Sequence, residues 1–202
     1  MLDPDIRHPL ANLLRPPHGC GSLLCEVGLW GNTVRIDLAR LTATRLEGFE
    51  IKSDGDTLAR LARQAEIYSL VLDTATLVGA RRHIDKAASM LPGWWGLTEA
   101  TPAGSAVGFS VIRPPLDNPA PSAERVAGLL WKDEALALLR DLGETRGLSR
   151  LRLAEAHALI ADCIPLEQVR AAVFGRLAAR RDWIDRHDPF FAGPFRPRAG
   201  AV

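Results

Sequence analysis

Two neighbouring segments that alternate apolar and other residues constrain the fold of this chain more than any other feature. The first covers residues 33–41, the second covers 45–52, and both are rich in branched or aromatic apolar residues. Alternation with a period of two is typical of a β-strand with one face in a core. Because only a short polar link joins the two segments, the pattern predicts adjacent strands, most simply connected as a hairpin.

The segments around this hairpin predict an α/β protein with a mixed central sheet. Apolar residues at helical spacing follow the hairpin, and β-branched stretches alternate with further helical ones, which is typical of a sheet with helices packed on its faces. Residues 22–30 fit either a strand or the end of a helix. We expect helices over about 5–15, 56–71 and 81–91, and strands over 75–79, 97–100 and 107–113.

The last third of the chain predicts a helical appendage. Residues 114–123 contain four prolines, which is typical of an irregular connector, and three segments with helical periodicity follow at 127–142, 151–163 and 166–187. The expected organisation is an N-terminal arm with a short helix (1–20), a core (21–113), a connector (114–123), a helical appendage (124–188) and a loosely ordered tail (189–202).

Charge and cysteine content limit the functions to consider. The chain has 25 basic and 24 acidic residues, so its net charge of +1 gives no overall field that attracts a polyanion, and any such site must be local. Three cysteines are an odd number and favour a reducing compartment over a disulfide framework. Without a secretory pattern or an apolar run of about 20 residues, we expect a cytoplasmic protein and no membrane partner.

Three residues of the predicted hairpin carry the chemistry. Asp37 lies on the first strand, and Glu50 and Lys52 on the second share one face because side chains alternate along a strand. The two carboxylates repel each other, and a divalent cation removes that repulsion. Oxygen ligands suit Mg²⁺ or Mn²⁺, which activate water and stabilise charge on a phosphodiester. Lys52 would orient or deprotonate the water, or neutralise the developing charge.

The spacing of Asp37 and the Glu50-x-Lys52 pair resembles the signature of the PD-(D/E)XK nuclease superfamily, with Ile36 in the place of its proline. Gln64 and Tyr68, four residues apart on the next predicted helix, resemble the Gln-x-x-x-Tyr motif of the RecB-like branch. The stretches EIKSDGDTL, RQAEIY, PGWWGL and LLWKDEAL are similar to a bacterial family of uncharacterised restriction-endonuclease-like proteins. The resemblance implies a restriction-endonuclease-like core.

The same resemblance implies further roles. Gln64 would lie beside the metal, and Tyr68 would support the site or touch substrate. Glu26 matches an upstream acidic position that supplies an additional metal ligand in such nucleases, and the backbone carbonyl of Ile51 is a further implied ligand. The implied activity is a Mg²⁺-dependent deoxyribonuclease, such as an endonuclease of DNA repair or of defence against foreign DNA.

Other functions stay open at this level. The chain can be an inactive nuclease-fold module that binds nucleic acid or a partner protein, an RNA-directed or toxin-like nuclease, or a protein in which the motif is accidental. DNA, single- or double-stranded, is the expected partner, and the C-terminal helices offer a surface for a homodimer or another protein. The sequence does not choose between phosphate contacts and an ordinary polar face for Arg35, Arg60 and Arg63. Trp94 and Trp95 are expected to pack in a core rather than stack on bases.

Overall fold

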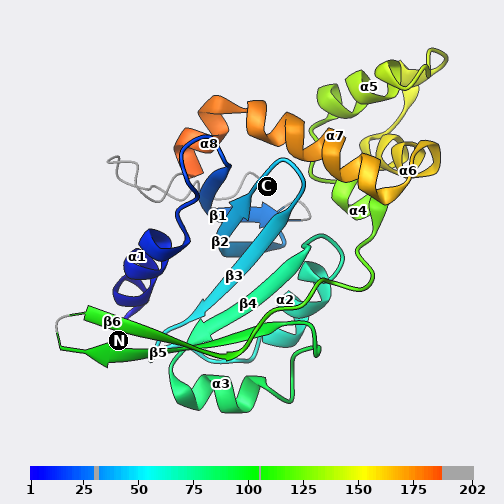
Figure 1. Ribbon diagram of the computed structural model, residues 1–202. Helices are drawn as coiled ribbons and strands as arrows, with labels where there is room; N and C mark the ends of the chain where they lie inside the picture. The colour runs from blue at the N-terminus through cyan, green and yellow to red at the C-terminus, as the bar shows by residue number, and fades with distance from the viewer. Residues whose placement is uncertain (30–31, 105, 188–202) are drawn as a thin grey trace.

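One six-stranded mixed β-sheet forms the centre of the protein (Figure 1). The computed structural model describes residues 1–29, 32–104 and 106–187. Neighbouring strands follow chain order, with antiparallel pairing at both ends of the sheet and parallel pairing from the third to the fifth strand. The strands are β1 (Ser22–Leu29), β2 (Val34–Leu41), β3 (Leu46–Lys52), β4 (Thr74–Gly79), β5 (Gly96–Ala103) and β6 (Ala106–Arg113).

The predicted hairpin is confirmed. Strands β2 and β3 pair antiparallel, with Leu41 opposite Leu46 next to the connection. The ambiguous segment 22–30 forms β1, apart from Trp30, which lies outside the described residues. The other predicted strands agree with β4, β5 and β6 to within a few residues, so the expected α/β class with a mixed sheet is correct.

Helices cover both faces of the sheet. Helix α1 (Asp3–Leu14) buries Ile6 and Leu10 in a smaller apolar cluster, the α1-side core, together with Ile51 of β3. Helices α2 (Leu61–Tyr68) and α3 (Arg81–Ala87) contribute to a larger cluster, the α2-side core. Since successive side chains on β3 point to opposite faces, Glu50 and Lys52 project toward α2 while Ile51 projects toward α1.

Helix α2 is shorter than the sequence predicted. The predicted span of 56–71 begins too early because Asp56 does not cap a helix. Its carboxylate instead accepts hydrogen bonds from the backbone N–H and the hydroxyl of Ser53, at 2.7 and 2.6 Å, and closes a turn. The helix begins only at Leu61, whose side chain is fully buried.

The C-terminal region contains more helices than the three that were predicted. The first predicted helix, 127–142, begins too early: α5 covers only Lys132–Asp141, where the Trp131 N–H donates to Glu134 at the helix start, and the short helix α4 (Ala123–Ala127) before it was not predicted. The third is divided at Arg180 into α7 (Leu166–Ala179) and α8 (Arg181–His187). Between them lie the short 3₁₀ helix Leu148–Arg150 and α6 (Leu153–Cys163).

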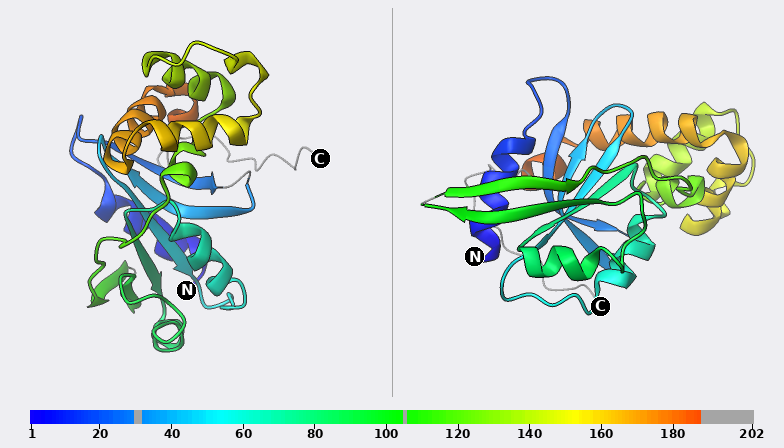
Figure 2. Two further views of the ribbon diagram at one scale, coloured as in Figure 1. Left: turned by 90° about the vertical axis from the view of Figure 1, so that its right-hand side faces the viewer. Right: turned by 60° about the horizontal axis from the view of Figure 1, so that its bottom comes forward.

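These helices gather at one end of the sheet, away from the extended β5–β6 hairpin (Figure 2). Buried residues of α4 to α7 belong to the same α2-side core as those of the sheet, so apolar packing is continuous between the two regions. Two polar contacts reinforce it: Arg170 of α7 is paired with Asp73 at 2.6 Å, and His187 Nδ1 lies 2.7 Å from the Cys25 carbonyl oxygen. The predicted tail 189–202 lies outside the described residues.

Cys20, Cys25 and Cys163 form no disulfide. Within the described ranges, no helix combines the length and apolar character needed to cross a bilayer.

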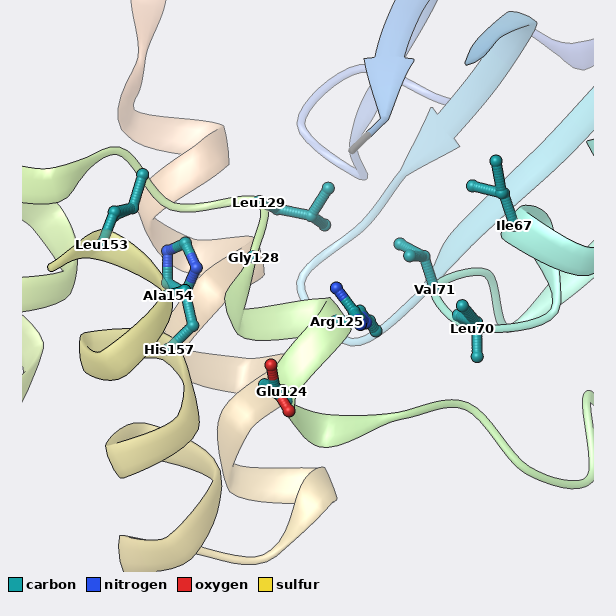
Figure 3. Close-up of a pocket in the computed structure, with 10 residues that line it drawn as sticks. All are labelled: Ile67, Leu70, Val71, Glu124, Arg125, Gly128, Leu129, Leu153, Ala154 and His157. Atoms are coloured by element: carbon teal, nitrogen blue, oxygen red, sulfur yellow. The ribbon is translucent and has the colours of Figure 1, made fainter. Parts of the chain in front are cut away.

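An apolar pocket of about 320 Å³ lies between the end of α2 on one side and α4 and α6 on the other (Figure 3). Ile67 and Val71 line one side, and Leu129 and Leu153 line the other. The imidazole of His157 also borders it, and its Nε2 lies 3.1 Å from the carbonyl oxygen of Leu130.

Burial of His157 is expected to make the protein less stable in mild acid. Burial lowers the pKa of the imidazole below its ordinary value, although the Leu130 carbonyl opposes this effect. As pH falls below about 6.5, the unfolded chain binds a proton that the folded state resists, so the free energy of unfolding decreases. Urea unfolding between pH 7.5 and 5 should show a steeper loss for the native protein than for His157→Gln. Equal slopes would contradict this assignment.

Candidate active site

The site lies where β2 and β3 separate. Their paired positions continue as far as Leu38 opposite Phe49, and the next pair in this register would be Asp37 and Glu50. At this point the Asp37 side chain replaces the backbone as the hydrogen-bond acceptor: its Oδ2 accepts a hydrogen bond of 2.7 Å from the Ile51 N–H. A carboxylate therefore occupies the fork between the strands, next to Glu50.

Glu50 is the centre of a buried hydrogen-bond network. Its side chain is almost completely buried, and its Oε1 accepts from Lys52 Nζ and from Gln64 Nε2, both at 2.6 Å. Its Oε2 accepts from the Tyr68 hydroxyl at 2.7 Å. Gln64 Oε1 lies 3.3 Å from Lys52 Nζ and accepts from it. The structure thus brings together Glu50, Lys52, Gln64 and Tyr68, which the sequence had selected as a set.

Helix α2 presents Gln64 and Tyr68 to the sheet, because they are four positions apart and share one face of the helix. Tyr68 is fully buried, and its ring stacks on Trp95 at a centroid distance of 5.7 Å and an interplanar angle of 1°. Burial, together with the nearby Glu50 carboxylate, raises the pKa of the Tyr68 phenol well above its usual value, so it remains a donor. Trp94 and Trp95 are both buried, which confirms their predicted packing role.

The Tyr68→Phe variant is expected to lose about 1.5–3 kcal/mol of stability, because a hydrogen bond to a buried carboxylate disappears while the aromatic stacking remains. Chemical denaturation of the native and variant proteins measures the difference, and near-UV circular dichroism verifies that the environment of Trp95 is retained. A change below about 0.5 kcal/mol would mean that the Tyr68 hydroxyl is bound elsewhere, for instance only to the Arg35 carbonyl oxygen, which also lies 2.7 Å away.

Asp37 has an unusual electrostatic environment. Burial and repulsion from Glu50 raise the pKa of its carboxyl from the ordinary value to about 7, whereas Arg7 and the Ile51 N–H act in the opposite direction. A carboxyl whose pKa is raised by a second carboxylate indicates a place where a cation is favourable. The repulsion that the sequence predicted between these two side chains is therefore present.

Asp37 and Glu26 lie at an irregularity shared by β1 and β2. Glu26 has a positive φ of 53°, which is uncommon for a residue with a side chain, and its pairing with Asp37 is missing from an otherwise regular ladder. On β2, Ile36 packs in the α2-side core and Leu38 in the α1-side core, although residues two apart normally share a face. The strands change phase at this point, and both carboxylates contact Arg7 of α1.

Sequence reasoning missed Arg7 of α1. Its guanidinium forms a hydrogen bond of 3.1 Å with Asp37 Oδ1 and one of 2.9 Å with the Asp37 carbonyl oxygen, and it lies 3.1 Å from Glu26 Oε1. It also bonds Asp3, one helical turn away. The four-residue spacing of Asp3 and Arg7 predicts an ion pair within the helix. It does not predict the contact of Arg7 with the sheet, which depends on how α1 docks.

The predicted metal ligands are only partly brought together. Asp37 and Glu50 are adjacent, and two carboxylates suit a hard divalent cation. However, residues 1–29, 32–104 and 106–187 contain no group of three or more His, Cys, Asp and Glu side chains arranged to hold a metal; Glu26 pairs with Arg7 here, and its role as a metal ligand stays a prediction. Ile51 contributes its N–H to Asp37, and a metal-binding role of its carbonyl stays a prediction.

The three arginines considered for phosphate binding are all exposed. Arg35 is half exposed and lies 3.6 Å from Glu26, so it faces the acidic side of the fork. Arg60 immediately precedes α2 and is exposed. Arg63 is exposed on α2 and forms an ion pair of 3.2 Å with Glu66. Their contact with a nucleic acid stays a prediction.

Comparisons with known proteins give a family match over most of the chain. A family model described as bacteriophage P4 protein cII matches residues 15–193. A solved protein of unknown function from Silicibacter pomeroyi is 19% identical; the match covers 63% of this chain and 83% of that chain, with a TM-score of 0.38. No curated protein matches the chain.

Proposed function

The chain belongs to the family of bacteriophage P4 protein cII, and we propose that it is a divalent-metal-dependent phosphodiesterase that hydrolyses DNA. The family's name states no reaction, so the proposal rests on the site. The observation that carries it is the Glu50 carboxylate, buried and held by Lys52, Gln64 and Tyr68, next to Asp37 with its pKa raised to about 7. Perturbed, converging groups of this kind are concentrated at functional sites.

The residues have distinct parts in this proposal. Asp37 and Glu50 would hold Mg²⁺ or Mn²⁺, with Glu26 and the Ile51 carbonyl as further ligands. The cation would supply Lewis-acid stabilisation of the phosphate and a lowered pKa of water. The Lys52 ammonium has three donors, and two are directed to Glu50 and Gln64. The third remains to orient a water molecule or a phosphate oxygen.

Gln64 and Tyr68 would position the two ionic groups. Gln64 accepts from Lys52 and donates to Glu50, which fixes the separation of ammonium and carboxylate. Tyr68 holds the other oxygen of Glu50. Arg35, Arg60 and Arg63 would bind the DNA backbone. DNA repair, or defence against foreign DNA, is the setting that the resemblance to PD-(D/E)XK nucleases supports for such an enzyme in the cytoplasm.

One observation favours a second candidate, a nuclease-fold module that binds DNA or a protein without cutting. Each carboxylate oxygen of Asp37 and Glu50 already has a hydrogen-bond donor from within the chain. A carboxylate oxygen accepts more than one bond, so this does not block a metal, but it stabilises the site without one.

The proposal is tested with labelled single-stranded, double-stranded and branched DNA and with RNA, each incubated with Mg²⁺ or Mn²⁺. Metal-dependent cleavage of DNA is the expected result, whereas cleavage of RNA alone would favour an RNA-directed enzyme. If no substrate is cut, titration calorimetry with Mn²⁺ separates the remaining possibilities. Binding that is lost in Asp37→Ala would indicate a missing partner or substrate, and no binding would favour the non-cutting module.

A further inference from the structure

The guanidinium of Arg7 is surrounded by carboxylates at the fork. Its Nε and Nη2 form hydrogen bonds of 2.7 and 3.1 Å with the two oxygens of Asp3. Its Nη1 lies 3.1 Å from Glu26, and its Nη2 donates to Asp37 at 3.1 Å. The side chain is only 17% exposed. Three acidic side chains from α1, β1 and β2 therefore share one cation that the chain itself supplies.

The positive charge of Arg7 reduces the repulsion between these carboxylates, as a bound metal ion would. The guanidinium of Arg7 is charged, because arginine is not deprotonated in proteins. A divalent cation at Asp37 would stand close to this charge and be repelled by it. Metal and guanidinium cannot both gain the full attraction of Asp37 and Glu26.

We propose that Arg7 is a built-in competitor for the divalent cation, which holds Asp37 and Glu26 in the metal-free protein and sets how tightly the metal binds. The inference rests on the proposed function, because it takes Asp37 as a metal ligand. It goes beyond that function by assigning to α1, which lies outside the motif, control over metal loading.

The exchange requires movement of the Arg7 side chain but not of α1. Ile6, Leu10 and Ala11 of the helix are buried in the α1-side core, and the terminal amino group of Met1 is paired with Asp54. The helix is thus anchored on both sides of Arg7. A long flexible side chain that is partly exposed can turn toward solvent while its backbone stays in place.

The test is Mn²⁺ titration calorimetry of the native protein, Arg7→Gln and a matched control, Arg81→Gln. Arg81 has the same charge but pairs with Asp85 and Glu99 at the surface of α3 and β5. Arg7→Gln is expected to bind Mn²⁺ on the order of tenfold more tightly, because the competing charge is gone. Arg81→Gln should bind Mn²⁺ as the native protein does. At physiological salt, exposed charges that are more than about 8 Å apart are largely screened from each other.

Thermal unfolding provides a second readout that does not depend on activity. Without metal, Arg7→Gln should melt below the native protein, because Asp3, Glu26 and Asp37 each lose their contact with this guanidinium. Saturating Mn²⁺ should raise its melting temperature more than that of the native protein, since a tighter ligand stabilises more.

The outcomes separate this inference from the proposed function. Native Mn²⁺ binding that disappears in Asp37→Ala, with unchanged or weaker binding in Arg7→Gln, would overturn the inference and leave the proposed function standing. Binding seen only in Arg7→Gln would support the inference in its strongest form. No binding in either the native protein or Arg7→Gln would overturn both.

Discussion

Asp37→Asn and Glu50→Gln are each expected to reduce metal-dependent DNA cleavage by on the order of a thousandfold or more. Each change keeps the shape of the side chain but removes one negative charge from the pair that would hold the metal. Loss of the several kcal/mol of transition-state stabilisation that a catalytic metal supplies corresponds to a rate loss of this size. Single-turnover cleavage of the best DNA substrate at saturating Mg²⁺ measures the effect.

The control for this pair of variants lies on the same helix as Gln64 and Tyr68. Glu66 is exposed and pairs with Arg63 at the surface, so Glu66→Gln makes the same chemical change outside the network. It should cleave at the native rate. Because Asn at position 37 still accepts from the Ile51 N–H, circular dichroism of Asp37→Asn should match the native protein. More than a tenth of native activity in both site variants would rule out their proposed role.

Asp73→Ala is expected to lose about 3–5 kcal/mol of stability, because it leaves a buried charge without its partner. Asp73 precedes β4 and is buried; its Oδ2 accepts from the Leu46 N–H at 2.7 Å, and its Oδ1 is paired with Arg170 of α7 at 2.6 Å. Truncation leaves a buried N–H and a mostly buried guanidinium without this partner. The carboxylate links the start of two strands to the C-terminal helices.

Urea unfolding of Asp73→Ala, followed by tryptophan fluorescence and by far-UV circular dichroism, measures the loss. The matched control is Asp117→Ala, because Asp117 is exposed and pairs with Arg45 at the surface. Its removal should leave the free energy of unfolding almost unchanged, because solvent screens an ion pair at the surface. If both aspartates had equally small effects, the Asp73–Arg170 pair would not hold the appendage to the sheet.

Local periodicity determined a large part of this protein from its sequence alone. Alternation along 45–52 predicted a strand with Glu50 and Lys52 on one face, and the four-residue spacing predicted that Gln64 and Tyr68 share a helix face. Both follow from the geometry of single elements, so the structure agrees with them. Element ends were less predictable: Asp56 forms a turn with Ser53 rather than a helix cap, and Arg180 interrupts a segment that is apolar-periodic throughout.

Only the tertiary structure decided which distant groups complete the site. Arg7 reaches Asp37 because α1 docks on the face opposite α2, and Trp95 supports Tyr68 because β5 lies beside β4. No period in the sequence encodes these contacts. The phase change at Glu26 and Asp37 is likewise invisible locally, since it depends on paired distortion of two strands. Periodicity sets the face on which a side chain lies, whereas packing of whole elements sets its neighbours and its charge environment.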